Sequence, residues 1–530
     1  MWLIWTLACT DDPEKEPGVS TVTLGEEQLC SSPSSSPAMH PGVLPDLYDG
    51  SAANGAIQYG GGGAAVADFD GDQILDIFLP NAGTDQLYFG TASGEFVEKP
   101  EAWPALEDAS VGAVPVDIDA DGDLDIFVTN MRGPNRLLRN DSGVFVDITT
   151  EAGVGGGDYD SIAASFADID LDGDLDFFVA NHRDDADLGA GLLEGKLLPG
   201  HPSELYRNNG DGTFADISNR LPSELQELGY PFMGVWQDFD GDAYPDLYVI
   251  NDFGAVAVPN LLLRNEQGQL SLWEEPGLNI SMFAMGVSVG DFNGDSRADV
   301  VLSDWGRMFL LADAGDGSFY DAGQAAGLII GEGRAQSWGV ELADMDNDGD
   351  LDLPVAFGPL KLEEWEEPYE EELSLSNPKN QPDALFLQED GQLQDQGEAW
   401  GLNQTGNSRG FVLADINRDG RLDLVKRFVD QPASLHLSDC TGAHWLELEL
   451  RQPGSNPRAV GAEVRLDAGG KTQLRWLRAG GTGFAVGQPP ELHFGLGDVA
   501  HVDRITVRWP DGRESMVEDI PTNRMITILR

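Results

Sequence analysis

Seven copies of a nine-residue acidic segment constrain this chain more than any other feature. Each copy has Asp at positions 1, 5 and 9 and Asp or Asn at position 3. The copies, named loops one to seven, occupy residues 68–76, 117–125, 168–176, 238–246, 291–299, 344–352 and 415–423. Successive loops begin 49 to 71 residues apart, which indicates a repeating unit of about 50 residues with two longer copies.

The residues around each loop favour short β-strands. An apolar run enters the loop, a β-rich run such as Ile126-Phe127-Val128 leaves it, and turn signals such as Asn209-Gly210 and Asp211-Gly212 follow. Four short strands per unit are typical of a propeller blade. The sequence therefore predicts an all-β protein: a seven-bladed β-propeller with calcium loops over residues 55–440.

A second β domain is expected after the last loop, over residues 441–530. Its period-2 alternation, as in residues 445–450 and 505–509, predicts a β-sandwich-like fold. Arginines gather in this segment, which favours docking against the acidic propeller. Because the whole chain has 31 basic and 92 acidic residues, nucleic acid is excluded as a partner.

The start of the chain predicts export. Residues 1–9 end in Cys9 like a lipoprotein signal, and residues 10–54 form a Ser-, Pro- and acid-rich segment that predicts a flexible tether. We expect a monomer that is secreted or on the cell surface, with membrane attachment through a lipidated Cys9 left open. Ring closure would bring Cys30 near Cys440, either as a disulfide or as two free thiols.

The two longer units contain insertions at residues 182–203 and 359–382. Both are predicted to be surface loops. The second is strongly acidic with two aromatic residues, which suits either a solvent-exposed loop or a binding site for a cationic partner.

Calcium is the cation that the loops predict. Ca²⁺ takes six to eight oxygen ligands in flexible geometry, which suits carboxylates at alternate positions of a curled backbone. Position 7 varies freely, as expected if only its backbone carbonyl is a ligand. An EF-hand is excluded because position 12 is never Glu and the flanks favour strands. We expect up to seven Ca²⁺ ions.

The loops and their entering strands resemble FG-GAP/VCBS repeats, the calcium-binding blades of integrin-α-type propellers. The tail resembles the ASPIC/UnbV domain through residues 461–464, 492–497 and 509–512. A propeller followed by this tail is the arrangement of cartilage-acidic-protein-like secreted proteins.

This resemblance implies calcium ligands at positions 1, 3, 5, 7 and 9. They are Asp68, Asp70, Asp72, Ile74 and Asp76; Asp117, Asp119, Asp121, Asp123 and Asp125; Asp168, Asp170, Asp172, Asp174 and Asp176; Asp238, Asp240, Asp242, Tyr244 and Asp246; Asp291, Asn293, Asp295, Arg297 and Asp299; Asp344, Asp346, Asp348, Asp350 and Asp352; Asp415, Asn417, Asp419, Arg421 and Asp423. Gln73, Ala243 and Ser296 replace the usual glycine at position 6, so loops one, four and five are expected to be tighter or weaker.

We expect a binding or adhesion module in which calcium is structural and the partner is an unknown protein or glycan ligand. The alternative is an extracellular propeller enzyme that acts on polysaccharide or another polymer. No catalytic residue is assigned. The G-x-S-x-G pattern at residues 286–290 is interpreted as a strand, and His182 and His201 are the candidates to test for catalysis.

Overall fold

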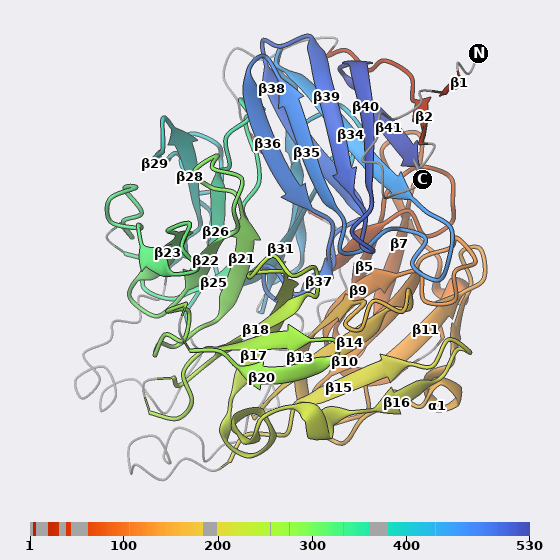
Figure 1. The fold of residues 1–530 in the computed structure, drawn as a ribbon, viewed down its shortest axis with the longest axis vertical. Helices are drawn as coiled ribbons and strands as arrows, with labels where there is room; N and C mark the ends of the chain where they lie inside the picture. The colour runs from red at the N-terminus through yellow and green to blue at the C-terminus, as the bar shows by residue number, and fades with distance from the viewer. Residues whose placement is uncertain are drawn as a thin grey trace.

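The computed structural model describes residues 4–6, 20–30, 39–43, 62–104, 106–183, 199–254, 256–274, 276–331, 333–359, 380–429 and 431–530. In this part of the chain the structure is built almost entirely from antiparallel β-sheets (Figure 1). The all-β prediction is confirmed. Most of both insertions, residues 184–198 and 360–379, and Cys9 lie outside the described residues.

Seven sheets repeat one plan, in which an acidic loop joins the first strand to the second. Sheet one is β4 (Ala65–Ala67), β5 (Asp76–Leu79), β7 (Gln86–Gly90) and β8 (Phe96–Glu98). Sheet two is β9 (Glu107–Val116), β10 (Asp125–Asn130), β11 (Arg136–Asn140) and β12 (Phe145–Asp147), with β6 (Ala82–Thr84) at its edge. Sheet three is β13 (Asp160–Ala167), β14 (Asp176–His182), β15 (Glu204–Asn208) and β16 (Phe214–Asp216).

The remaining four sheets follow the same plan. Sheet four is β17 (Pro231–Gln237), β18 (Asp246–Asn251), β19 (Leu261–Glu266) and β20 (Gln269–Leu272). Sheet five is β21 (Gly286–Gly290), β22 (Asp299–Ser303), β23 (Met308–Asp313) and β24 (Phe319–Asp321), so the G-x-S-x-G pattern is a strand. Sheet six is β25 (Ser337–Val340), β26 (Leu353–Phe357), β28 (Ala384–Glu389) and β29 (Gln392–Asp395). Sheet seven is β31 (Ser408–Ala414), β32 (Asp423–Phe428), β33 (Ser434–Ser438) and β3 (Met39–Val43).

Shorter elements connect these sheets. They are the strand pair β27 (Gln381–Pro382) and β30 (Thr405–Gly406), the helix α1 (Thr149–Ala152), and the helical turns η2 (Pro100–Ala102), η3 (Ser218–Arg220) and η4 (Glu224–Leu228).

The first strands of the seven sheets contact one another in a closed cycle. The contacts run from β4 to β9, β13, β17, β21, β25 and β31, and β31 returns to β4. Hydrophobic clusters fill the spaces between neighbouring sheets; one of them joins Phe127 and Phe177 of sheets two and three. The arrangement is propeller-like, with the apolar face of each sheet buried against the next.

The N-terminal segment completes two sheets. The strand β3 pairs with β33 as the outer strand of sheet seven, and β2 (Thr21–Leu24) joins β1 (Ile4–Thr6) to a sheet of the tail. Cys30 and Cys440 form a disulfide with their Cα atoms 5.7 Å apart. Parts of the predicted tether are therefore strands, because the free edges of sheet seven and of the tail offer backbone partners.

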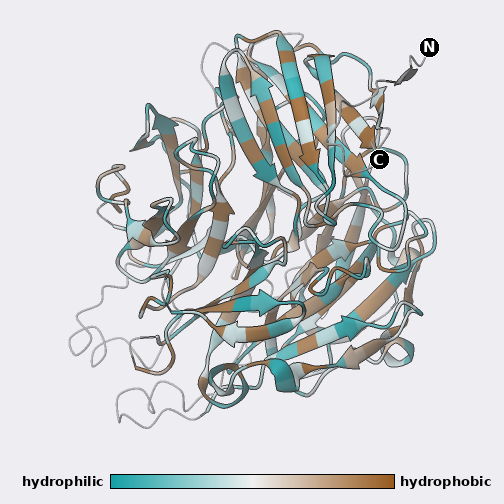
Figure 2. Cartoon of the chain, viewed as in Figure 1, coloured by the Kyte–Doolittle hydropathy of each residue, from teal (hydrophilic) through white to brown (hydrophobic). Residues whose placement is uncertain are grey.

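The tail is a pair of sheets around one core. The first has the order β1-β2-β41-β34-β38 and the second β36-β35-β39-β40. Their further strands are β34 (His444–Arg451), β35 (Glu463–Ala468), β36 (Lys471–Trp476), β38 (Glu491–Gly497), β39 (His501–Arg508), β40 (Glu514–Pro521) and β41 (Arg524–Leu529). Hydrophobic and polar residues alternate along these strands (Figure 2), and the hydrophobic set, which includes Leu446, Leu466 and Ile505, is fully buried.

A segment of the tail, residues 479–487, lies at the centre of the ring of first strands. The strand β37 (Ala479–Gly480) pairs with β13, and single bridges join Gly483 to Val287 and Gly487 to Ala65. Phe484 is fully buried, with ring-to-ring contacts to Phe232 and Trp338. We call residues 479–487 the axial segment; it gives the tail and the ring a common core.

Glycines in or just before the first strands let the backbone of the axial segment approach closely. A Cβ atom on Gly63 would lie 2.1 Å from the carbonyl oxygen of Ala485, and one on Gly410 would lie 2.8 Å from that of Phe484. Only glycine allows so close an approach of two backbones. No helix among the described residues is long and apolar enough to cross a bilayer.

Candidate metal centres

The aspartate at position 9 holds the backbone of each loop together. In all seven loops it is fully buried, and it begins or immediately precedes the second strand. One carboxylate oxygen accepts the backbone N–H of position 2, at 2.7–3.1 Å. The other accepts a backbone N–H at the end of the third strand, at 2.8–2.9 Å. Position 9 therefore ties loop, second strand and third strand into one unit.

The aspartates at positions 1 and 5 curl the loop. Asp168 accepts the backbone N–H groups of Asp172 and Gly173 at 3.0 and 2.9 Å, and Asp172 accepts that of Asp174 at 3.0 Å. The same position 5 to position 7 bond recurs in all seven loops. These bonds curl the backbone of the loop.

All seven loops share one backbone conformation. Positions 4 and 6 have positive φ in every loop, whether or not they are glycine. Gln73, Ala243 and Ser296 at position 6 have φ of 72°, 78° and 63°, while their loops have glycine at position 4. A non-glycine residue in this region costs about 1–2 kcal/mol. Loops one, four and five therefore have the same pattern of positive φ at positions 4 and 6 as the other loops.

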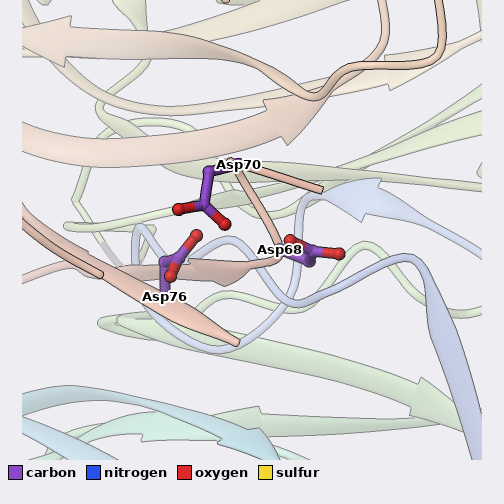
Figure 3. A group of neighbouring side chains, drawn as sticks. All are labelled: Asp68, Asp70 and Asp76. Atoms are coloured by element: carbon purple, nitrogen blue, oxygen red, sulfur yellow. The ribbon is translucent and has the colours of Figure 1, made fainter. Parts of the chain in front are cut away.

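Five loops bring three carboxylates together. In each group, one oxygen per residue lies within 4.8 Å of the others. The groups are Asp68, Asp70 and Asp76; Asp117, Asp119 and Asp125; Asp168, Asp170 and Asp176; Asp238, Asp240 and Asp246; and Asp344, Asp346 and Asp348. Figure 3 shows the first group, with the carboxylates of Asp70 and Asp76 turned toward each other beside Asp68.

The donor set of these five loops fits a hard cation. Each has a buried carboxylate oxygen without a hydrogen bond: Asp70 Oδ1, both oxygens of Asp117, Asp170 Oδ1, Asp240 Oδ2, which only an ion pair with Arg264 reaches, and Asp344 Oδ1. A buried polar atom without a partner is costly, and a cation with oxygen ligands would satisfy it. Five loops in the described chain can therefore hold metal ions such as calcium.

The same crowding disfavours ionised aspartates when no cation is present. Burial raises the pKa of Asp76, Asp125 and Asp176 to about 8, and neighbouring aspartates add to the rise. At position 1, burial raises the pKa of Asp168 and Asp344 to about 7. A divalent cation would offset both effects because it favours the charged carboxylates.

Loops five and seven differ from the others. No three carboxylates converge within 4.8 Å in either of them, and position 3 is Asn293 or Asn417. In loop five the guanidinium of Arg297, at position 7, forms an ion pair with the carboxylate of Asp295 at position 5. The side chain at position 7 therefore takes part in the site, which its free variation in the sequence does not predict.

A set of side-chain amides, which the loop pattern did not predict, links neighbouring loops. Asn140, at the end of the third strand of sheet two, donates to the carbonyl of Leu124 in its own loop at 3.0 Å and to that of Phe69 in loop one at 2.7 Å. Asn265 joins loops four and three in the same way, at 2.9 and 2.8 Å. The signal was present: Leu-Leu-Arg-Asn occurs at residues 137–140 and 262–265, and Leu-Tyr-Arg-Asn at 205–208.

The tail docks on the side of the ring that carries the loops. Arg508 lies 3.3 Å from Asp238 of loop four, and Lys471 lies 3.3 Å from Asp350 of loop six. Arg458 donates to the carbonyl of Gly122 in loop two at 2.6 Å. The predicted docking of the arginine-rich tail against the acidic loops is confirmed.

A cavity of about 350 Å³ opens between the tail and sheets three to five. Trp476 of the tail and Phe239 of loop four supply aromatic surface, the fully buried Trp509 lies in the wall, and Asp238 and Arg508 supply charge. Cavities of this size are typical of small-ligand sites.

The two candidate catalytic histidines lie at the other end of β14 from loop three. The backbone N–H of His201 donates to the carbonyl of His182 at 3.3 Å, so the structure brings them together. His182 Nε2 is 3.6 Å from Asp252 Oδ2, and His201 Nδ1 is 3.7 Å from Asp160 Oδ2.

Comparison with known proteins bears on both parts of the chain. The FG-GAP-like repeat family matches residues 68–128, 117–179, 238–302 and 291–355, and the ASPIC and UnbV family matches residues 452–530. Cartilage acidic protein 1 of Homo sapiens is 25% identical over 285 residues, which are 45% of this chain and 42% of the relative. The Xenopus tropicalis protein of that name is 27% identical over 248 residues, 43% of this chain and 34% of the relative. The chain thus spans less than half the length of these relatives.

Among solved structures, PorZ, a surface component of the type-IX secretion system of Porphyromonas gingivalis, gives a TM-score of 0.41 at 10% identity. The match covers 91% of this chain and 61% of that chain. A likeness this weak does not bear on function.

Proposed function

Because the chain consists of FG-GAP-like repeats followed by an ASPIC and UnbV domain, and is distantly homologous to cartilage acidic protein 1, we propose that it is an exported, calcium-stabilised binding protein. Its repeats form a seven-bladed β-propeller, its acidic loops hold structural calcium, and its ligand binds between the propeller and the tail. The observation that carries the proposal is the convergence of three carboxylates in five loops, each with a buried oxygen that lacks a hydrogen bond.

Three features support seven blades. Seven sheets have the same strand and loop order, their first strands contact in a closed cycle, and β3 completes the last sheet from the start of the chain. A last sheet that takes its outer strand from the other end of the chain closes the ring by joining its two ends. The disulfide between Cys30 and Cys440 fixes the same junction.

The disulfide also supports export. Disulfides persist in oxidising environments and are rare in the cytosol of most organisms. The lipid anchor on Cys9 stays a prediction, since Cys9 lies outside the described residues.

Calcium would act as a structural ion. The loop carboxylates, with the backbone carbonyl at position 7, supply the oxygen ligands that this ion prefers. Extracellular modules of this kind bind calcium with a Kd on the order of 10⁻⁴–10⁻³ M.

The cavity beside loop four is the proposed ligand site. Aromatic faces with a nearby carboxylate and guanidinium suit a glycan, because sugar rings stack on aromatic groups and their hydroxyls bond to charged ones. Trp476 is half-buried at the cavity, and the Arg508–Asp238 ion pair lies beside it. A glycan of one or two rings is the occupant that this cavity fits best.

A glycan array with calcium present tests the ligand. We expect selective binding by the full chain that is lost in the W476A variant. The Y320A variant, which removes an exposed aromatic residue elsewhere, is expected to bind as the wild type does. Equal binding by the wild type and W476A would contradict the proposed site.

The alternative, an enzyme that acts on a polymer, rests on His182 and His201 with their carboxylate neighbours. Incubation with soluble polysaccharides and measurement of new reducing ends tests it. Activity that is lost in the H201A variant would replace the binding proposal with the enzymatic one.

A further inference from the structure

We infer that loops five and seven bind no calcium, because an asparagine at position 3 and an arginine at position 7 leave no group of three converging carboxylates, so that the protein holds five calcium ions. This inference rests on the proposed calcium-binding function and concerns only how the seven loops divide. Three observations single out the same two loops. They are the residue composition of each loop, the ion pairs and hydrogen bonds of its side chains, and its buried carboxylate oxygens without a hydrogen bond.

Composition separates the loops into two groups. Loops one, two, three, four and six each have four or five aspartates and no basic residue. Loop five has three aspartates with Arg297, and loop seven has three with Arg418 and Arg421. The two loops without a carboxylate at position 3 are also the two with an arginine at position 7. A lower negative charge and an internal cation both weaken calcium binding.

In loop five, Arg297 forms an ion pair with the carboxylate of Asp295, which is a predicted calcium ligand. Its Nη2 bonds to the carboxylate of Asp295 and, at 3.3 Å, to the carbonyl of Asp313. Its Nε lies 3.6 Å from the carboxylate of Asp313. A guanidinium is always charged and presents several donors in one plane, so it can satisfy two acidic groups at once.

In loop seven, the basic residues are Arg418 at position 4 and Arg421 at position 7. Arg418 bonds to Glu447 at 2.8 Å and to both oxygens of Glu491 at 2.7 and 2.9 Å. Arg418 thus pairs with the tail rather than with a carboxylate of loop seven. Arg421 is almost fully buried and reaches the backbone carbonyl of Asp346 in loop six at 3.0 Å.

Hydrogen bonds and packing close loop seven further. The side-chain amide of Asn417 donates to Asp419 at 3.2 Å, so position 3 bonds to position 5 directly. The indole of Trp445 lies against Gly420, where an added Cβ would be 1.9 Å from its Nε1.

Unpaired oxygens mark the same division. Among the described residues, loops one, two, three and six each have a buried carboxylate oxygen with neither a hydrogen bond nor an ion pair, and in loop four Asp240 Oδ2 pairs only with Arg264; neither loop five nor loop seven has a buried carboxylate oxygen without a hydrogen bond. A loop that already satisfies its carboxylates gains less from a metal and must break ion pairs to admit it. The five loops therefore retain a carboxylate oxygen for a cation that loops five and seven lack.

Calcium stoichiometry of the full chain tests the inference. Equilibrium dialysis followed by elemental analysis, at calcium far above the Kd, should give five ions per chain. Six or seven ions would overturn the inference while leaving the proposed function in place. The absence of bound calcium would overturn the proposed function itself.

A variant of loop five gives a second test. N293D/R297D restores carboxylates at positions 3 and 7 and should raise the count from five to six. The matched control, Q324D/R307D, makes the same charge change at exposed positions outside the loops and should stay at five. A count of five in N293D/R297D would contradict the role given to Arg297. The wild-type count remains decisive if this variant does not fold.

Discussion

At the scale of single residues, the aspartates of one loop divide into two kinds. Position 9 accepts backbone N–H groups with both oxygens, whereas positions 1 and 3 retain oxygens that no donor reaches in four loops. The alternating carboxylates were predictable because they lie within nine residues of one another. The backbone role of position 9 was not, because its second donor lies on the third strand, in Asn208 for Asp176.

This division predicts different effects for two isosteric substitutions in loop three. D176N removes one acceptor and sets an amide against a backbone donor, so it should cost about 1–3 kcal/mol of unfolding free energy in EDTA. The cost should be larger in calcium, because Asp176 is also one of the three converging carboxylates. D170N leaves the backbone bonds intact and lowers only the charge of the site. Its cost should appear in calcium and vanish in EDTA. Urea denaturation of both variants in each buffer measures the difference, and an equal cost for D170N in EDTA would be inconsistent with its role as a ligand.

The pKa values of the buried aspartates predict how the calcium-free protein responds to pH. Asp76, Asp125 and Asp176 have a pKa of about 8 in the folded protein and about 3.9 when unfolded. Because the folded pKa is the higher one, protonation favours the folded state. The stability of the calcium-free protein should fall as pH rises from about 4 to 8.

Melting curves in EDTA between pH 5.5 and 8.5 check this trend. With saturating calcium the trend should weaken or reverse, since calcium binds the ionised carboxylates. A melting temperature in EDTA that rises with pH would contradict the assignment of these groups.

At the scale of strands and sheets, local order was predictable and distant pairing was not. The run of strand, acidic loop and strand follows from apolar alternation and aspartate spacing, and each sheet has it. The pairing of β3 with β33 and of β37 with β13 joins segments hundreds of residues apart, and short strands carry little sequence signal. Residues 479–487 show no alternation that would place them inside the ring.

The axial segment predicts a large cost for one substitution. Phe484 is fully buried between Trp338 and Phe232, with ring centroids at 5.6 and 5.8 Å. F484A should lower the unfolding free energy by about 3–5 kcal/mol. Y320A, at an exposed aromatic residue of β24, should change it by less than about 0.5 kcal/mol. Guanidinium denaturation compares the two; a cost for F484A as small as that for Y320A would mean that the segment does not share the core.

At the scale of the whole molecule, the acidic loops, the tail and the ring form one connected structure. The tail contacts loops two, four and six through Arg458, Arg508 and Lys471, and its axial segment packs inside the ring. The arginines of the tail made this docking predictable, but its register was not. The occupied axis also favours a ligand site at the junction of ring and tail over one in an open central channel.

The central claim is that calcium in the loops holds the ring together, and thermal unfolding of the full chain in 10 mM calcium and in EDTA at one pH tests it most directly. Five sites with a Kd on the order of 10⁻⁴–10⁻³ M should raise the melting temperature in calcium by on the order of 10 °C. Magnesium at the same concentration should restore little of this gain, because it rarely uses sites built from protein ligands alone. The same melting temperature in calcium and in EDTA would contradict the claim.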